Sequence, residues 1–350
     1  MVPFLDGHND VLLSLHLESE GPQPFLDGRP LGHLDLARAH AGGFAAGLFA
    51  IFVPSEDARD PAAMPIPIRE PPYAQPLAAP IDPGYARREA AAMIDLLLAL
   101  ESAADGQVEA VRDLSGLERC LAGEALGAIL HFEGAEPVAA DLCNFAELYA
   151  RGLRSLGLVW SRPNAFAEGV PFAFPDIPET GPGLTAAGKE LVREANRLGV
   201  MLDLSHLNER GFWDVAELSE APLVASHSNV HALCANTRNL TDAQLDEIGR
   251  SGGIVGITFH AGMLGEDGRT DAAIPLGTLL DHVDYAVQRI GVDHVGFGSD
   301  FDGAVVIDEL GDAAGLPRLV EALRDRGYGD EEVVKLAHAN WLRVIGASWR

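Results

Sequence analysis

Lysine is nearly absent from this chain of 350 residues, which contains only Lys189 and Lys335. Lysine and arginine together number 25 against 52 aspartates and glutamates, which gives a formal net charge of -27 at pH 7. Nucleic acids and anionic membrane surfaces attract basic proteins, because their phosphate groups are negatively charged. The charge balance therefore argues against both as partners.

Cysteine and long apolar runs are also scarce. The cysteines Cys120, Cys143 and Cys234 are scattered and odd in number, so we expect no disulfide framework and a reducing compartment. The longest apolar stretch, residues 42–53, is too short to span a bilayer. The first residues lack the basic and apolar regions of a secretion signal. We predict a cytoplasmic protein with no membrane partner.

The hydrophobic content of 47% is ample for a buried core, and strand patterns alternate with helical patterns throughout. The predicted strands cover residues 4–7, 45–53, 125–132, 155–159, 200–204, 223–225, 254–259 and 295–298. The predicted helices include residues 34–40, 85–104, 142–151, 185–198, 209–218, 241–250, 276–290, 316–326 and 330–339. Eight strands, each with its own helix, predict a closed parallel (β/α)8 barrel. We expect it to form one domain that spans residues 1–350.

Three stretches interrupt this repeat. Nine prolines fall between Pro54 and Pro83, a density that excludes regular structure. This insertion is either a lid or subunit contact, or a plain surface insertion. A second long loop is expected at residues 160–183, and an irregular loop is expected from the first strand to about Pro30.

Polar residues with metal-binding side chains stand where the apolar strands end. His8 and Asp10 end the first strand and point the same way, because alternate residues of a strand share a face. Four later strands end on suitable residues, namely Glu133, His206, His227 and Asp300. The carboxyl ends of the strands in a parallel barrel meet at one face, so we expect these side chains to share one pocket.

Three imidazoles with one or two carboxylates suit zinc better than calcium or magnesium. The candidates exceed the needs of one four-coordinate ion, so two ions that share a carboxylate are predicted. Such a pair lowers the pKa of a bridging water from about 15.7 toward about 7, and the hydroxide can attack a carbonyl. Asp300 is the candidate for proton transfer, and Asp302 stays an alternative. The predicted reaction is hydrolysis at a carbonyl, most simply of an amide.

Other candidate residues have plainer interpretations. His260 ends the seventh predicted strand and can reach the substrate. His131 shares a strand face with Glu133 and is expected inside the barrel, whereas Asp203 is expected to accept hydrogen bonds from neighbouring donors. Six further histidines are expected to be packed or surface residues, namely His33, His40, His231, His282, His294 and His338.

The strand ends also carry a family resemblance. The motifs are Asp6-Gly7-His8-Asn9-Asp10, Glu133-Gly134, Asp203-Leu204-Ser205-His206, Ser226-His227-Ser228-Asn229 and Gly298-Ser299-Asp300-Phe301-Asp302-Gly303. In this order they closely resemble the membrane dipeptidase (renal dipeptidase) family of zinc peptidases, in the amidohydrolase superfamily. The resemblance extends over nearly the whole chain.

The resemblance implies a distorted (β/α)8 barrel with two Zn2+ per chain. It assigns His8 and Asp10 to the first zinc ion, His206 and His227 to the second, and Glu133 to both. The implied activity is hydrolysis of dipeptides with free termini, of the form L-Xaa-L-Xaa, L-Xaa-D-Xaa or both. A homodimer is also implied.

The resemblance further assigns proton transfer to Asp300 and binding of the substrate's C-terminal carboxylate to Arg238. A guanidinium suits that role, because it can donate two parallel hydrogen bonds to a carboxylate. One position departs from the family pattern. Better-known members have a histidine after the fourth strand that stabilises the tetrahedral intermediate, and this chain has Trp160 there. Its indole N–H donates a single hydrogen bond and carries no charge.

Two alternatives stay open. A two-metal hydrolase of this design could act instead on a lactam, a lactone or an N-acyl amino acid. Loss of Arg238 would discriminate these possibilities, because it should affect only substrates with a free carboxylate. The second alternative is a barrel that binds metal or ligand without catalysis. Retention of all the metal-ligand candidates and of Asp300 argues against it.

Overall fold

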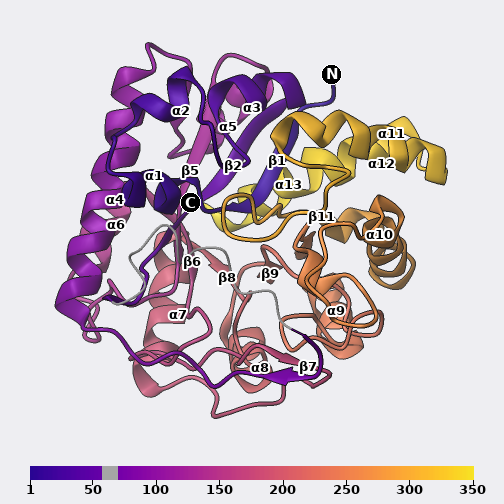
Figure 1. Ribbon diagram of the computed structural model, residues 1–350. Helices are drawn as coiled ribbons and strands as arrows, with labels where there is room; N and C mark the ends of the chain where they lie inside the picture. Colours follow the sequence, from indigo (N-terminus) through magenta and orange to yellow (C-terminus); the bar gives the residue numbers. More distant parts are fainter. Residues whose placement is uncertain (57–69) are drawn as a thin grey trace.

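The computed structural model describes residues 1–56 and 70–350. Within these residues, eight parallel strands follow one another around a nearly closed barrel (Figure 1). They are β1 (Phe4–Asn9), β2 (Phe44–Phe52), β5 (Leu126–Glu133), β6 (Leu153–Gly157), β8 (Met201–Asp203), β9 (Val224–Ala225), β10 (Ile254–Ile257) and β11 (Val295–Phe297). A further strand, β4 (Val108–Ala110), pairs with the first half of β5. The predicted parallel barrel is therefore confirmed.

The barrel closes between β11 and β1 near the carboxyl ends of both strands. The backbone N–H of Asp300 donates to the carbonyl of His8 at 3.0 Å, and that of Asp10 donates to the carbonyl of Phe301 at 2.8 Å. Because these bonds join the first and last strand ends, residues almost 300 positions apart in sequence meet at the carboxyl face of the barrel.

Helices surround the strands (Figure 1). The α-helices are α1 (Val11–Glu18), α2 (Gln23–Asp27), α3 (Leu36–Gly42), α4 (Pro83–Ala103), α5 (Leu114–Leu121), α6 (Phe145–Ala150), α7 (Ala186–Leu198), α8 (Glu209–Leu218), α9 (Asp242–Arg250), α10 (Leu276–Ile290), α11 (Leu316–Arg326), α12 (Asp330–Val334) and α13 (Asn340–Ser348). The predicted N-caps are present, since the Thr185 and Thr241 side chains accept bonds from the backbone N–H groups of Gly188 and Gln244. None of the described helices is long and apolar enough to cross a bilayer.

The core fills the barrel and its contacts with the helices. All residues of β1 and β5 are buried, as expected for parallel strands covered on both faces. Trp341 of α13 is fully buried, and its indole Nε1 donates to the carbonyl of Phe297 at 3.0 Å. A Cβ on Gly7 would lie 2.4 Å from the Trp341 ring, so only glycine allows this close packing.

Several predicted element boundaries were wrong. The expected loop after the first strand contains α1 and α2. The last predicted helix does not end at residue 339, because a π-helical turn at Lys335–Ala339 leads directly into α13. The helix α1 was missed because its buried residues Val11, Leu12, Leu13 and Leu15 cover more than one face, which leaves no simple amphipathic period.

The proline-rich segment lies partly outside the described residues, since 57–69 are not described. The exclusion of regular structure between Pro54 and Pro83 is nevertheless wrong at β3 (Tyr73–Ala74). This strand pairs antiparallel with β7 (Ala173–Phe174), which lies inside the long loop predicted at 160–183. A two-residue strand requires few backbone donors, so neighbouring prolines do not prevent it.

Candidate metal centre

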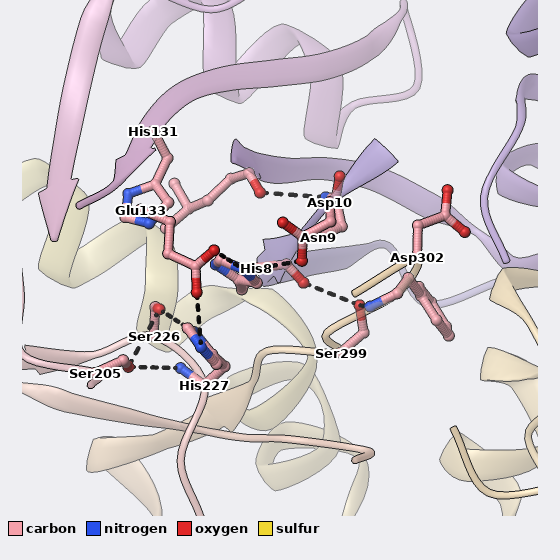
Figure 2. A network of polar contacts seen from close by, with 12 residues as sticks. His8, Asn9, Asp10, His131, Glu133, Ser205, Ser226, His227, Ser299 and Asp302 are labelled. Carbon is pink, nitrogen blue, oxygen red and sulfur yellow. Dashed lines mark hydrogen bonds and ion pairs between the residues drawn. The ribbon is translucent and has the colours of Figure 1, made fainter. Parts of the chain in front are cut away.

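Five of the predicted side chains converge at the carboxyl face of the barrel. Glu133, the last residue of β5, lies between the histidines (Figure 2). Its Oε1 is 3.0 Å from His206 Nε2 and 3.7 Å from His227 Nε2, whereas its Oε2 is 3.9 Å from His8 Nε2. His8 Nε2 is in turn 3.3 Å from Asp10 Oδ2. One oxygen of this carboxylate therefore faces His206 and His227, and the other faces His8.

Unusual backbone conformations direct two of the site residues into the barrel. His206 has φ 67° and Asp300 has φ 61°, in the left-handed region that residues with side chains rarely adopt. The loop that carries Asp300 also passes very close to Asp10. A Cβ on Gly303 would lie 2.0 Å from Asp10 Oδ2, so this position requires glycine.

Serine hydroxyls orient two of the imidazole rings. Ser161 Oγ lies 3.0 Å from His206 Nδ1, and Ser226 Oγ lies 2.8 Å from His227 Nδ1. The Ser226 hydroxyl donates to Asp203 Oδ2 at 2.6 Å, so it accepts from the Nδ1–H of His227. The Nε2 of His227 then carries a lone pair toward Glu133, as a metal ligand requires. Neither serine was among the predicted site residues.

The site histidines His206, His227 and His8 differ in how readily they are protonated. Burial lowers the pKa of His206 and of His227 well below 6.5, and the nearby Arg238 and His8 lower both further. Burial also opposes a charge on His8, but the carboxylates of Asp10 and Glu133 raise its pKa to about 10. Burial raises the pKa of Glu133, and Asp10 adds to this effect. The carboxylates thus create a strongly negative local field that attracts a positive charge.

The donor set fits bound cations. The Nε2 atoms of His206 and His227 are only 3.1 Å apart, and both face the same oxygen of Glu133. Without metal, a proton on His206 Nε2 can be donated within this group, whereas two imidazole lone pairs and one carboxylate oxygen directed at the same point suit a bound cation. The histidine and carboxylate atoms also group closely enough to hold an ion in two sets that share His8, one with Glu133 and His227 and one with Asp10 and Asp300.

A cavity of about 70 Å³ opens beside this cluster. It is lined by Asp10, Leu13, Phe52, Glu133, Trp160, Phe172, His206, Arg238, His260, Met263, Asp300 and Gly303. All three predicted substrate-contacting residues, Arg238, Trp160 and His260, are therefore in its wall. A larger cavity of about 440 Å³ lies around the N-terminus and α5, but the metal-ligand candidates do not line it.

Polar and apolar groups occupy different parts of the cavity wall. Arg238 is buried, and its guanidinium donates to the carbonyl of His227 at 3.1 Å. Burial lowers the pKa of Arg238 to about 10, so the group remains cationic at neutral pH. The ring of Trp160 lies 5.0 Å from that of Phe52 and 5.6 Å from that of Phe172, which forms an apolar wall.

Asp300 and Asp302 have different surroundings. Asp300 lines the cavity, and burial raises its pKa to about 6. Asp302 instead accepts hydrogen bonds from the guanidinium of Arg29 and from the backbone N–H of His33. Figure 2 shows its carboxylate turned away from Glu133. Asp302 therefore does not replace Asp300 in the cavity.

The remaining polar candidates lie outside the cavity wall, as expected from the sequence. His131 is fully buried inside the barrel, with Nδ1 2.9 Å from Ser155 Oγ. Asp203 accepts from the backbone N–H and the hydroxyl of Ser226. The six histidines expected to be packed or surface residues do not line the cavity, namely His33, His40, His231, His282, His294 and His338.

Comparison with known proteins identifies relatives over the full chain. A model of the membrane dipeptidase family, peptidase family M19, matches residues 1–348. A metallopeptidase from Rhodobacter sphaeroides, solved with a phosphinate mimic of the dipeptide L-Ala-D-Ala, is 48% identical, with a TM-score of 0.96 and 99% of each chain covered.

Two further relatives are similar to this chain. The solved structure of dipeptidase AC, a metallopeptidase of family M19, is 47% identical, with a TM-score of 0.93 and 99% of both chains covered. An uncharacterised protein in the pqqA 5′ region of Klebsiella pneumoniae is 46% identical over 245 residues. That match covers 70% of this chain and 90% of the Klebsiella protein.

Proposed function

This chain belongs to the membrane dipeptidase family, peptidase family M19, and is a metal-dependent dipeptidase; we propose that its reaction takes place at two zinc ions. The proposed ligands are His8 and Asp10 for one ion, His206 and His227 for the other, and Glu133 for both. The position of Glu133, with one oxygen toward His8 and the other toward His206 and His227, is the observation that carries this proposal.

Bound zinc ions would lower the pKa of water and polarise the peptide carbonyl. The protein's own task is to position the substrate beside them. Arg238 is a buried cation in the cavity wall, and we assign it the C-terminal carboxylate of the dipeptide. The rings of Phe52, Trp160 and Phe172 supply an apolar surface for the rest of the substrate.

Asp300 is proposed to move the proton. Its carboxyl group lies in the cavity wall, and burial raises its pKa to about 6, near the value at which a group can both accept and release a proton at neutral pH. It would take a proton from the attacking water and deliver it to the leaving amine. Trp160 cannot supply a charge to the developing oxyanion, so its proposed role is apolar contact with the substrate, and His260 is proposed to contact the substrate as well.

The proposed substrates are dipeptides with free termini and an L- or D-configured C-terminal residue. The relative from Rhodobacter sphaeroides was solved with a mimic of L-Ala-D-Ala, which supports including D-residues. A homodimer and a cytoplasmic location stay predictions from the sequence.

A substrate screen with metal analysis tests the proposal. Purified enzyme would be assayed against L,L- and L,D-dipeptides and against N-acyl amino acids, before and after chelation and after zinc is restored. We expect dipeptide hydrolysis that disappears on chelation, returns with zinc and coincides with two zinc ions per chain. Activity that survives complete metal removal, or a preference for N-acyl amino acids, would contradict the proposal.

A further inference from the structure

The loop that carries Arg238 is held by hydrogen bonds from both of its ends. The side chain of Asn236 accepts from the backbone N–H of Arg238 at 3.0 Å. The side chain of Asn239 donates to the carbonyls of Cys234 at 2.9 Å and Met263 at 3.0 Å. The position of the guanidinium therefore depends on its own bond to the carbonyl of His227 and on how residues 236–239 are anchored.

The two-stranded sheet β3–β7 anchors the residues immediately before Arg238. Asn236 Nδ2 donates to the hydroxyl of Tyr73 in β3 at 3.1 Å. In β7, the backbone N–H of Ala173 donates to Thr237 Oγ1 at 3.2 Å, and the backbone N–H of Thr237 donates to the carbonyl of Ala173 at 3.2 Å. The Thr237 hydroxyl also donates to the carbonyl of Pro171.

The same sheet continues into the cavity wall. Phe172, the residue before β7, lines the cavity, and the backbone N–H of Gln75 donates to its carbonyl at 2.9 Å. One small sheet thus contacts the apolar side of the pocket and the loop that carries its cation. This sheet joins two segments, 73–75 and 172–174, that are far apart in the sequence.

We infer that the β3–β7 sheet, through Tyr73 and Thr237, positions Arg238 and thereby sets how strongly the pocket selects ligands with a free C-terminal carboxylate. The inference rests on the proposed role of Arg238 in carboxylate binding. Two parallel hydrogen bonds from a guanidinium to a carboxylate require a narrow geometry. A small displacement of the loop would weaken carboxylate binding and leave contacts to the rest of the ligand in place.

Conservative changes at the contacts between the sheet and the loop test this role. Tyr73→Phe removes the hydroxyl that accepts from Asn236, and Thr237→Val replaces the hydroxyl that joins the loop to β7 with a methyl group. Tyr328→Phe is the matched control, because its hydroxyl also makes a side-chain hydrogen bond, to Asp284 at 2.8 Å, and it does not line the cavity. Thermal melting would verify that all variants fold.

The measurement compares two inhibitors, a phosphinate dipeptide mimic with a free C-terminal carboxylate and its C-terminal amide. In Tyr73→Phe and Thr237→Val, we expect the inhibition constant of the carboxylate form to rise about three- to tenfold, and that of the amide to change by less than about twofold. For dipeptide substrates, KM should rise more than kcat falls. The control variant Tyr328→Phe should have the same inhibition constants as the parent protein for both inhibitors.

A third variant separates failure of this inference from failure of the proposed function. Arg238→Met should abolish the preference for the carboxylate form. If Arg238→Met keeps that preference, the assigned role of Arg238 is wrong. If Arg238→Met loses it while Tyr73→Phe and Thr237→Val retain the parent's ratio, the sheet does not position Arg238. Equal weakening of both inhibitors in the sheet variants would also overturn the inference.

Discussion

Mild acid is expected to destabilise this protein through His282, a fully buried residue of α10. Its Nδ1 accepts from the backbone N–H of Val230 at 3.0 Å, and its Nε2 lies 3.0 Å from the carbonyl of Leu264. Both bonds require a neutral ring with the proton on Nε2, because Nδ1 must offer a lone pair. His282 thus ties α10 to two loops that also carry site residues, His227 and Met263.

The size of the stability loss follows from the pKa of His282. Burial lowers the pKa of His282 from 6.5 to about 4, so the unfolded chain binds the proton at a higher pH than the folded protein does. The resulting stability is fully present above pH 6.5 and is lost as the pH falls toward 4. With pKa values of 6.5 in the unfolded chain and about 4 in the folded protein, proton linkage lowers the free energy of unfolding by about 2 kcal/mol between pH 7 and pH 5. The loss reaches about 3 kcal/mol by pH 4.

Urea unfolding at pH 7 and pH 5, at one fixed zinc concentration, measures this loss. His282→Gln keeps a donor for Leu264 and cannot titrate, and the exposed His40 provides a control in His40→Gln. Between the two pH values, the free energy of unfolding of His282→Gln should fall by about 2 kcal/mol less than that of the parent. The reasoning is refuted if the parent, His282→Gln and His40→Gln all lose the same free energy.

Three further substitutions test the site and its support. Glu133→Gln should reduce hydrolysis by about 100-fold or more, because metal-ion catalysis contributes several kcal/mol, and mass spectrometry should find fewer zinc ions per chain. Ser226→Ala removes the acceptor for His227 Nδ1 and should weaken zinc affinity about 10- to 100-fold in a chelator competition assay. Asp302→Asn removes one of the two carboxylates that pair with the buried Arg29 and leaves only Glu18, so urea unfolding should show a loss of about 2 kcal/mol; an unchanged midpoint would contradict this.

The barrel was predictable because the strand and helix patterns of this chain are distinct. Its helices α8, α10 and α11 begin and end at the predicted residues, since each has one apolar face and a polar face. The helix α1 was not predictable in this way. Its residues Val11, Leu12, Leu13 and Leu15 are all buried, so no polar face marks the helical period. Pairing of β3 with β7 was also not predictable, because it joins two short segments about 100 residues apart.

The site was predictable as far as strand geometry extends. His8 and Asp10 face the same way, as alternation along β1 requires, and their side chains meet at 3.3 Å. Asp300 and Asp302 are also two residues apart, so alternation would place both in the cavity. They follow β11 with φ values of 61° and 67°, however, and a left-handed backbone does not alternate as a strand does. Only Asp300 enters the cavity, whereas Asp302 turns to Arg29, a residue whose place next to this loop no local pattern in the sequence indicates.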